Sequence, residues 1–346
     1  MDFGRKIINC RMCNSDKLFN FLDLGFTPPS DGILTPEELA EPEIMFPLKV
    51  LQCKDCGLTQ LNYAVNPKIL YGEKYKYESS ITETGKNHFF SMADSISKKF
   101  NFGKGDLAVD IGSNVGVLLE GFKKNNLDVL GIDPVHYVAE KANQRGIETW
   151  EELITPEVAL RIVKEKSKPK IVSATNVFAH IDDKENLMES IKIMLDDEGI
   201  FVIEAPYLVD LIDNVEYDTI YLEHLEYLSV KPLVKFFEKH GMDLFDIERT
   251  EIHGKSIRIY VSKKNKKVIS KNVQNLLMLE ENKKIYEEDT LKQFALNVEL
   301  NKKNFLALLI DLKKQGKKIV GISAPAKGNT ILNYCKIDSS LISYMT

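Results

Sequence analysis

Residues 107–116 read Leu-Ala-Val-Asp-Ile-Gly-Ser-Asn-Val-Gly and decide how the middle of the chain folds. A short apolar run ends at Asp110, passes through Gly112 and Gly116, and enters a segment whose apolar residues have helical spacing. This order predicts a strand, a tight glycine turn and the start of a helix. Such a turn lets a ligand approach the backbone closely and meet the positive end of the helix.

A second strand-like run, residues 128–133, ends in another acid, Asp133. A carboxylate at this place can accept hydrogen bonds from both hydroxyls of a ribose, so the two segments together predict a cofactor that contains a nucleoside. The dinucleotide fingerprint Gly-x-Gly-x-x-Gly is broken, because Asn114 and Val117 stand where its second and third glycines would be. Asp110 would repel phosphates and favour a cationic ligand.

The pattern Asp-x-Gly-x-x-x-Gly with a later acid resembles two cofactor motifs of class I S-adenosylmethionine (SAM) methyltransferases. The resemblance implies that SAM is the cofactor and that the loop and the second acid bind it. The residues concerned are Asp110, Gly112, Asn114, Gly116 and Asp133. Taken alone, the first loop also fits a turn glycine in an ordinary βα unit, an alternative that the second acid weakens.

The composition limits the class of protein. The chain has 346 residues, of which 44% are hydrophobic, enough for two or three domains with a substantial core. The formal net charge of −5 argues against nucleic-acid binding driven by bulk charge. No apolar leader follows Met1, and no window reaches about eighteen apolar residues. We therefore expect a cytoplasmic protein with neither a membrane nor a nucleic acid as partner.

Four of the five cysteines form two Cys-x-x-Cys pairs. These are Cys10 with Cys13 and Cys53 with Cys56. In a reducing compartment such pairs favour a metal over disulfides, and two of them close a tetrahedral zinc site with no open position. The sequence therefore predicts a structural Zn²⁺ in a domain over residues 1–70. The alternative is two unrelated buried or redox pairs, and Cys335 is expected to be a core cysteine.

From residue 107 to 264 the hydrophobic pattern alternates between strands and helices, as a doubly wound α/β sheet requires. Strands are predicted near 107–112, 128–133, 170–177, 199–205, 242–250 and 256–262. The last two are joined by a short connection around His253, so they must be antiparallel. A mostly parallel sheet that ends in an antiparallel hairpin is typical of SAM methyltransferases, and we expect this fold in a domain over residues 71–264.

The remaining residues, 265–346, are predicted to form a third domain. The basic stretch 263–272 fits a solvated linker better than a nucleic-acid contact. We expect a long helix over 273–315, a strand over 317–323 and a loop over 324–330 that opens another helix. One strand and one helix cannot make a sheet, so this region is predicted to be a partial Rossmann-like domain.

An insertion after the strand near 199–205 gathers groups suited to proton transfer. Ligands of open α/β sheets bind beyond the carboxyl ends of the strands, and the insertion leaves from that edge. His224 could remove a carbon-bound proton that a neighbouring carbonyl acidifies, and Tyr221 could hydrogen-bond the enolate oxygen that develops. Glu223 could orient the imidazole or a sugar hydroxyl. A surface histidine without function is the alternative.

Asn176 and His180 lie at or just past the end of the strand near 170–177, where the cofactor methyl would be. His180 is a second candidate acid or base, and Asn176 is a candidate cofactor ligand. Equally, the two side chains could serve only to fix the loop.

Seven short motifs, in order along residues 10–334, resemble a family of SAM-dependent C-methyltransferases that act on nucleotide-linked deoxysugars. Members have an N-terminal zinc domain with four cysteine ligands, a central SAM fold and a C-terminal Rossmann-like domain. The motifs are Cys10-x-x-Cys13 with Cys53-x-x-Cys56-Gly57, Tyr75-x-Tyr77-x-Ser79-Ser80, Asp110-Ile-Gly112-Ser-Asn114-Val-Gly116, Asn176-Val-Phe-Ala-His180, Tyr221-Leu-Glu223-His224, His253-Gly-Lys-Ser256-Ile-Arg258 and Ala326-Lys327-Gly328-Asn329-Thr330. Each motif alone is weak, whereas seven in order are fairly specific.

The resemblance implies an enolate mechanism on a nucleoside-diphosphate-linked 4-keto-deoxysugar. The sugar loses its C3 proton to a histidine base, for which His224 is the candidate, and the enolate attacks the SAM methyl. Tyr221 and Tyr77 would lie near the sugar, and Arg258 and Lys327 near the nucleotide diphosphate. The other implied substrate-binding residues are Ser80, Tyr207, His253, Ser256 and Asn329.

The chain departs from the family pattern in two places. Lys255 stands where the family usually has a glycine, and the C-terminal domain is a half-domain shorter. The competing hypotheses are a zinc-ribbon RNA methyltransferase, a small-molecule O- or N-methyltransferase, and a noncatalytic scaffold. The residues leave the sugar, the nucleoside, the methylated carbon and the oligomeric state open.

Overall fold

The computed structural model describes residues 2–72, 75, 77–79, 82–323 and 325–346. They form two compact units, each assembled from segments that are distant in the sequence. Unit 1 comprises Met1–Tyr75, Leu208–Ser229 and Leu279–Thr346, and unit 2 comprises Lys76–Tyr207 and Val230–Met278. The division predicted from the sequence, into 1–70, 71–264 and 265–346, groups these segments differently and stays a prediction.

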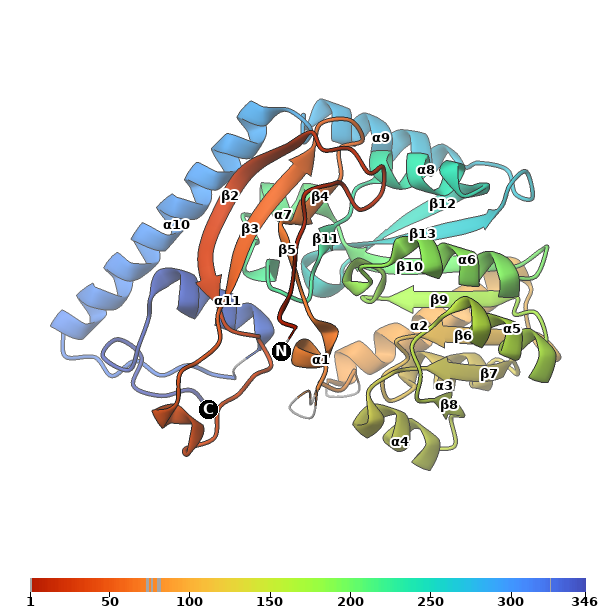
Figure 1. Ribbon diagram of the computed structural model, residues 1–346, viewed down its shortest axis with the longest axis horizontal. Helices are drawn as coiled ribbons and strands as arrows, with labels where there is room; N and C mark the ends of the chain where they lie inside the picture. Colours follow the sequence, from red (N-terminus) through yellow and green to blue (C-terminus); the bar gives the residue numbers. More distant parts are fainter. Residues whose placement is uncertain (1, 73–74, 76, 80–81, 324) are drawn as a thin grey trace. The chain divides into compact units, whose positions relative to one another are not determined.

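A seven-stranded sheet in the order β12-β13-β10-β9-β6-β7-β8 is the core of unit 2 (Figure 1). Its strands are β6 (Leu107–Ile111), β7 (Asp128–Ile132), β8 (Thr149–Trp150), β9 (Ile171–Thr175), β10 (Ile200–Pro206), β12 (Met242–Thr250) and β13 (Ser256–Lys263). Neighbours from β10 to β8 are parallel, whereas β13 is antiparallel to both β10 and β12. This topology confirms the predicted doubly wound sheet with an antiparallel last hairpin.

Burial explains why these segments are strands. All residues of β6 are buried, as are all residues of β10 except the last. Strands covered on both faces give nearly continuous apolar runs in a sequence. Helices α2 and α3 pack together, as do α5 and α6. The helices of this unit are α2 (Glu83–Phe100), α3 (Val117–Lys124), α4 (His136–Gln144), α5 (Pro156–Glu165), α6 (Lys184–Met194) and α8 (Val230–Lys239). Thr82 and Thr155 cap α2 and α5 by accepting backbone N–H groups.

Unit 1 contains a four-stranded antiparallel sheet and a separate strand pair, β1 with β5. The larger sheet has the order β11-β4-β3-β2. Strand β11 comes from the segment after β10, and the others come from the N-terminal module, the part of the chain that holds β1 to β5. The strands are β1 (Gly4–Lys6), β2 (Leu18–Thr27), β3 (Phe46–Cys53), β4 (Thr59–Leu61), β5 (Tyr63–Val65) and β11 (Glu226–Tyr227). Two short helices, α1 (Pro67–Leu70) and α7 (Leu208–Asp213), complete these segments. The insertion is therefore part of the fold of the N-terminal module.

The C-terminal region differs from its prediction. The single helix expected over 273–315 is two helices, α9 (Lys271–Asn282) and α10 (Glu288–Lys314), separated by a turn. The prediction of a strand over 317–323 is wrong, because these residues form only an isolated parallel bridge, between Gly321 and Met345, instead of a ladder of paired residues. The final helix, α11 (Ala326–Cys335), begins in the predicted loop.

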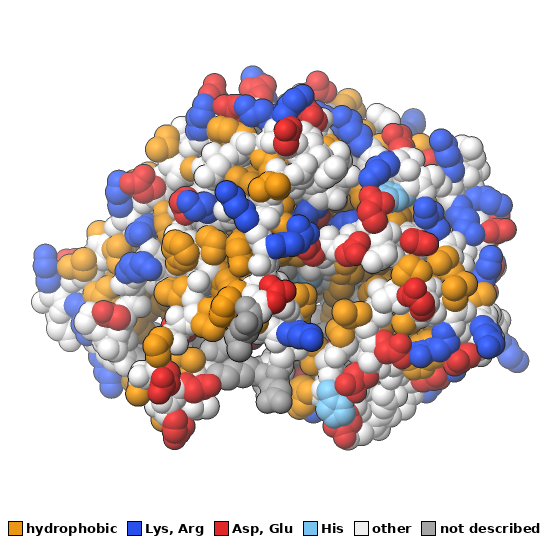
Figure 2. Space-filling view, viewed as in Figure 1, with side chains coloured by type: hydrophobic (Ala, Val, Ile, Leu, Met, Phe, Trp, Pro, Cys, Tyr) orange, Lys and Arg blue, Asp and Glu red, His pale blue; other side chains and the backbone are white. Residues whose placement is uncertain are grey.

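Acidic and basic side chains are interspersed over the face shown in Figure 2, as expected for 46 Lys and Arg beside 51 Asp and Glu. Among the helices of the described residues, none combines the length and the apolar character needed to cross a bilayer.

Candidate active site

The four paired cysteines come together in unit 1. The Sγ atoms of Cys10, Cys13, Cys53 and Cys56 all lie within 4.8 Å of one another. Sγ–Sγ distances are 3.5 Å for Cys10–Cys56 and for Cys13–Cys53. A tetrahedral Zn²⁺ with ordinary Zn–S bonds separates its sulfurs by about 3.8 Å, so the cluster fits this metal. The backbone N–H of Leu58 donates to Cys56 Sγ at 3.4 Å and orients that ligand, as outer-shell groups of zinc sites do.

Two glycines shape the loop that follows β6. Gly112 and Gly116 have φ values of +66° and +75°, and Gly116 caps the N-terminus of α3. A Cβ at Gly112 would lie 2.4 Å from a side-chain carbon of Val177, and one at Gly116 would lie 2.8 Å from a side-chain carbon of Ile147. Both the backbone conformation and the available space therefore require glycine.

Two buried acids stand at the ends of neighbouring parallel strands. Asp110 Oδ1 accepts a hydrogen bond from Ser173 Oγ at 2.6 Å. Burial raises the pKa of Asp110 to about 7, the hydrogen bond from Ser173 opposes this rise, and the charge of Asp133 adds to it. Burial also raises the pKa of Asp133, although its two oxygens accept the backbone N–H groups of Asn114 (2.8 Å) and Val135 (3.0 Å).

Asn114 connects this loop to the segment before α2. Its backbone has φ +52°, its Oδ1 accepts the backbone N–H of Ser79 at 2.8 Å, and its Nδ2 donates to the carbonyl of Tyr77 at 3.0 Å. The Tyr77 side chain is 48% exposed. The prediction for Ser80 lies outside the described residues. Asn114 thus ties this loop to Tyr77 and Ser79, just before α2.

The donor set of this loop fits SAM. Two carboxylates beside a glycine loop favour a cationic ligand with ribose hydroxyls over a pyrophosphate. Asp110, Gly112, Asn114, Gly116 and Asp133 all lie at the carboxyl edge of β6 and β7, as expected from the sequence. When bound, SAM supplies an electrophilic methyl group.

Asn176 and His180 follow β9. Asn176 has φ +54°, and its backbone N–H donates to the carbonyl of Glu204 at 2.7 Å. Burial, with a smaller contribution from the nearby charge of Lys184, lowers the pKa of His180 to about 4. A histidine with this pKa is neutral and weakly basic at physiological pH, which disfavours His180 as a general base.

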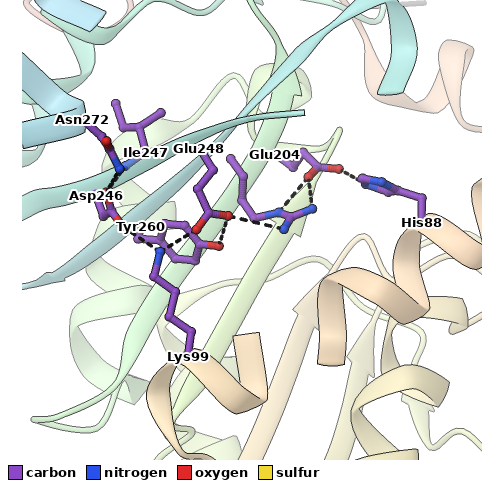
Figure 3. A network of polar contacts seen from close by, with 9 residues as sticks. His88, Lys99, Glu204, Asp246, Ile247, Glu248, Tyr260 and Asn272 are labelled. Atoms are coloured by element: carbon purple, nitrogen blue, oxygen red, sulfur yellow. Dashed lines mark hydrogen bonds and ion pairs between the residues drawn. The ribbon is translucent and has the colours of Figure 1, made fainter. Parts of the chain in front are cut away.

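A buried polar network in unit 2 was not predicted (Figure 3). His88 Nε2 lies 2.5 Å from Glu204 Oε1, while Glu204 Oε2 accepts from Arg258 Nε at 2.9 Å and Nη2 at 2.7 Å. Glu248 lies 3.7 Å from Arg258 Nη1 and accepts from Tyr260 at 2.8 Å. Burial opposes ionisation of Glu204, but His88 and Arg258 hold its pKa below the usual value. Arg258, expected near a diphosphate, is thus a partner of carboxylates within the sheet.

Three further predicted residues lie at the loop before β13 or contact it. Ser256 is fully buried and donates to the carbonyl of Ile252 at 3.0 Å. The backbone N–H of Tyr207, also buried, donates to the carbonyl of Lys255 at 3.3 Å. His253 belongs to a short 3-10 helix, and its side chain is not among those described. Ser256 and Tyr207 therefore help to shape this loop.

In unit 1, the imidazole of His224 is fixed by its own loop. His224 Nδ1 lies 2.8 Å from the carbonyl of Thr219, which requires the proton to be on Nδ1 and gives Nε2 the lone pair. The rings of Tyr221 and His224 lie 3.9 Å apart between centroids, with a 35° angle between planes. The hydrogen bond to the carbonyl of Thr219 thus orients the imidazole, whereas the carboxyl group of Glu223 accepts from Ser30.

Glu223 lies beside His224 in sequence but contacts a different part of the chain. It is 4% exposed, and its Oε1 accepts a hydrogen bond from Ser30 Oγ at 2.7 Å. Burial raises the pKa of Glu223 to about 7. The hydrogen bond from Ser30 opposes this rise, whereas the negative charge of Asp31 adds to it. Burial raises the pKa of Tyr71 well above the usual value, and the charge of the nearby Glu223 raises it further.

Helix α11 supports the same loop. The hydroxyl of Thr330, which is 1% exposed, donates to the carbonyl of Ile220 at 2.8 Å. Asn329 Nδ2 lies 3.4 Å from the carbonyl of Pro28. Asn329 and Ser30 also line a cavity of about 220 Å³ within unit 1. Lys327, on the first turn of α11, contributes a positive charge near Glu216.

The structure thus gathers the predicted residues into two sets. The residues predicted to bind the cofactor belong to unit 2, whereas Tyr221, Glu223, His224, Lys327 and Asn329 belong to unit 1. Sequence reasoning missed several neighbours of these residues, which are Ser30, Asp31, Tyr71, Ser173 and Thr219. It also missed His88, which bonds to Glu204. A possible signal was the buried acid Glu204 in an apolar strand, because such a group needs a partner.

Comparison with known families covers most of the chain. Residues 10–71 match the model of a zinc binding domain, residues 90–246 match a methyltransferase domain, and residues 251–346 match the C-methyltransferase C-terminal domain. The C-methyltransferase NovU of Streptomyces niveus is 32% identical over 344 residues, which span 99% of this chain and 82% of NovU.

Solved structures with similar folds are more distant. The magnesium protoporphyrin IX methyltransferase ChlM of Synechocystis PCC 6803 is 12% identical, with a TM-score of 0.42 over 54% of this chain and 90% of ChlM. A SAM-dependent methyltransferase of Anabaena variabilis is 14% identical, with a TM-score of 0.41 over 50% of this chain and 84% of its own.

The sheet topology, the cofactor loop and the cysteine cluster define a SAM-dependent methyltransferase with a zinc-binding module. The full-length likeness to NovU and the C-terminal match make the acceptor atom a carbon. The chain belongs to the C-methyltransferase family, and it is a SAM-dependent C-methyltransferase.

Proposed function

We propose that the enzyme methylates C3 of a nucleoside-diphosphate-linked 4-keto-deoxysugar. The observation that carries the proposal is the fixed imidazole of His224, whose Nδ1 bond to Thr219 gives Nε2 the lone pair beside the phenol of Tyr221. A base and a hydroxyl donor in one loop suit enolisation next to a ketone, because one takes the proton while the other stabilises the developing oxyanion.

In the proposed reaction, His224 Nε2 takes the C3 proton and becomes imidazolium. The electron pair of the broken C–H bond forms an enolate with the C4 carbonyl, and Tyr221 and Tyr77 donate to its oxygen. The nucleophilic carbon of the enolate would then bond to the methyl group that SAM supplies, while the electron pair of the broken S–CH₃ bond would stay on sulfur. Glu223 would hold a sugar hydroxyl. SAM binding rests on Asp110, Asn114 and Asp133.

The nucleotide part of the substrate is assigned to α11. Lys327 and Asn329 lie on its first turn, where a cation and the helix N-terminus favour an anion. Arg258 is left out of this role because its guanidinium is engaged by Glu204 and Glu248. A cytoplasmic location accords with four thiols that hold a metal, since the cytoplasm keeps thiols reduced.

The RNA methyltransferase hypothesis is less well supported. The basic run contributes Lys263, which pairs with Asp197 at 2.7 Å, and Lys266, which pairs with Glu198 at 3.0 Å. Lys267 also lies 3.6 Å from Glu198. Lysines already neutralised by acids offer little attraction to phosphates.

The test uses the purified enzyme with SAM and a set of nucleoside-diphosphate 4-keto-6-deoxyhexoses. We expect a product heavier by one methyl group, with the new carbon–carbon bond at C3 by NMR. In D₂O without SAM, the C3 proton should exchange with solvent, and His224→Ala should abolish this exchange. His136→Ala, on the exposed face of α4, is the matched control and should keep it. Exchange that survives in His224→Ala removes His224 as the base.

A further inference from the structure

A serine of the N-terminal module touches the proposed active-site loop. Ser30 follows β2 and lies 193 residues from Glu223 in the sequence, yet its hydroxyl donates to Glu223 Oε1 at 2.7 Å. The backbone of Glu223 itself and that of Ser30 also favour the charged form of this carboxyl group. Because Glu223 is only 4% exposed, water cannot readily replace these contacts. The carboxyl group is therefore held by the N-terminal module through one oxygen.

The other oxygen is in a different situation. Glu223 Oε2 is buried and makes no hydrogen bond among the described residues. A buried carboxylate oxygen without a partner is costly, and such groups in native structures call for an explanation. Ser30 also lines the cavity of about 220 Å³ shared with Asn329. Glu223 itself is not among the described residues that line this cavity.

The titratable groups that face Glu223 are Asp31, Tyr71 and Tyr227. Burial raises the pKa of both tyrosines well above the usual value, so they stay neutral near pH 7. The protonation of Glu223 then depends on two opposed neighbours. The hydrogen bond from Ser30 favours the carboxylate, whereas the charge of Asp31 and burial favour the acid.

We propose that Ser30 is a positioning residue of the enzyme, which fixes the orientation and charge of Glu223 in the loop that carries the proposed base, His224. The inference rests on the proposed function, because the role of His224 as the base belongs to it. The N-terminal module then contributes to the active site as well as carrying the metal. Ser30 acts through Glu223 and touches no reacting atom.

The first test needs no substrate. The carboxyl carbon of Glu223, labelled with ¹³C and assigned through Glu223→Gln, is titrated by NMR in the zinc-loaded enzyme. Ser30→Ala should raise the pH at the midpoint of the Glu223 titration, and Asp31→Asn should lower it. Ser30→Thr should restore the wild-type midpoint. Ser340→Ala, which removes an exposed serine–carboxylate bond to Asp338, is the matched control and should change nothing. An unchanged midpoint in Ser30→Ala overturns the inference.

The second test is kinetic. Ser30→Ala should lower kcat for methyl transfer roughly tenfold to a hundredfold, as expected for losing a hydrogen bond to a charged group, and should move the acid limb of the pH profile to higher pH. Ser30→Thr should recover both. Equal zinc content and circular dichroism exclude misfolding as the cause.

The two arms separate the inference from the function it rests on. Wild-type methylation together with an unchanged rate and pH profile in Ser30→Ala overturns the role of Ser30 and leaves the function standing. Wild-type enzyme that methylates none of the nucleotide sugars overturns the function, and the NMR titration still decides whether Ser30 sets the charge of Glu223.

Discussion

Glu204 and Arg258 face each other across β10 and β13 as a buried ion pair, with Nη2 and Oε2 2.7 Å apart. The next strand places Glu248 opposite Arg258 in the same way. Arg258→Met would leave Glu204 buried without its guanidinium partner. We expect the free energy of unfolding to fall by about 3–5 kcal/mol, measured by urea denaturation.

An exposed ion pair on the same strand provides the comparison for this variant. Lys263→Met removes a pair with Asp197 in which the carboxylate is well exposed, and should cost no more than about 1 kcal/mol. If the free energy of unfolding falls by similar amounts in the two variants, burial of the Glu204–Arg258 pair makes no difference to its contribution to stability.

The cysteine cluster predicts a defined metal content. Cys53→Ser should reduce bound zinc from about one ion per chain to nearly none, because three thiolates hold the metal much less tightly than four. Metal analysis of the purified protein measures the change. Cys335→Ser, which lies outside the cluster beside Tyr217, should retain the zinc. Full zinc content in Cys53→Ser would exclude the four-cysteine site.

The raised pKa of Asp110 predicts that SAM affinity depends on pH. Burial brings this pKa to about 7, so without ligand the group is mostly protonated at pH 6. A sulfonium cation favours the carboxylate, so affinity should rise with pH towards 7, by at most about tenfold per unit. Calorimetry between pH 6 and 8 measures the slope, which Asp110→Asn should flatten. A wild-type slope of opposite sign would contradict this reasoning.

The same group affects stability with a definite sign. Its folded pKa lies above the ordinary value of 3.8, so the folded protein binds this proton more tightly than the unfolded chain does. For this group alone, the free energy of unfolding of the ligand-free enzyme falls as pH rises from about 4 to about 7. Asp110→Asn should lose that contribution in thermal melts taken across the window.

Lys255 carries backbone strain that a glycine would relieve. Its φ is +83° and its ψ is 120°, a combination that side chains disfavour. Lys255→Gly should raise the free energy of unfolding by about 1 kcal/mol, determined by chemical denaturation. Lys266→Gly, at a position of ordinary φ, should lower stability instead. Loss of stability in both variants would show that the strain is absent.

Much of unit 2 could be predicted from the sequence because its signals are local. Buried parallel strands such as β6 give continuous apolar runs, and Gly112 marks a backbone conformation that other residues avoid. Strand β8 has only two residues, too few for a pattern. The strand predicted over 317–323 failed because an apolar run favours extended backbone, whereas a ladder also needs a partner strand.

The partners of the site residues could not be read from the sequence. The neighbours Tyr221 and Glu223 make His224 a candidate base. The hydrogen bond that sets its tautomer goes to the backbone carbonyl of Thr219, which a residue of any type could supply. Ser30 lies 193 residues from Glu223, and nothing in its own segment distinguishes it from a turn serine. Arg258 was interpreted as a ligand contact because a lone arginine gives no sign of the acids opposite it.

The pairing of β11 with β4 leads us to expect that the enzyme's chemistry depends on metal supply. Tyr227 and Glu226, three and two residues beyond His224, hydrogen-bond across to Thr59 and Gln60, directly after the second cysteine pair. A chelator that never reaches the SAM loop would release this strand from its neighbour and loosen the loop that carries the proposed base. Zinc-starved cells would then accumulate an enzyme that still holds its methyl donor but has lost the means to create a nucleophile.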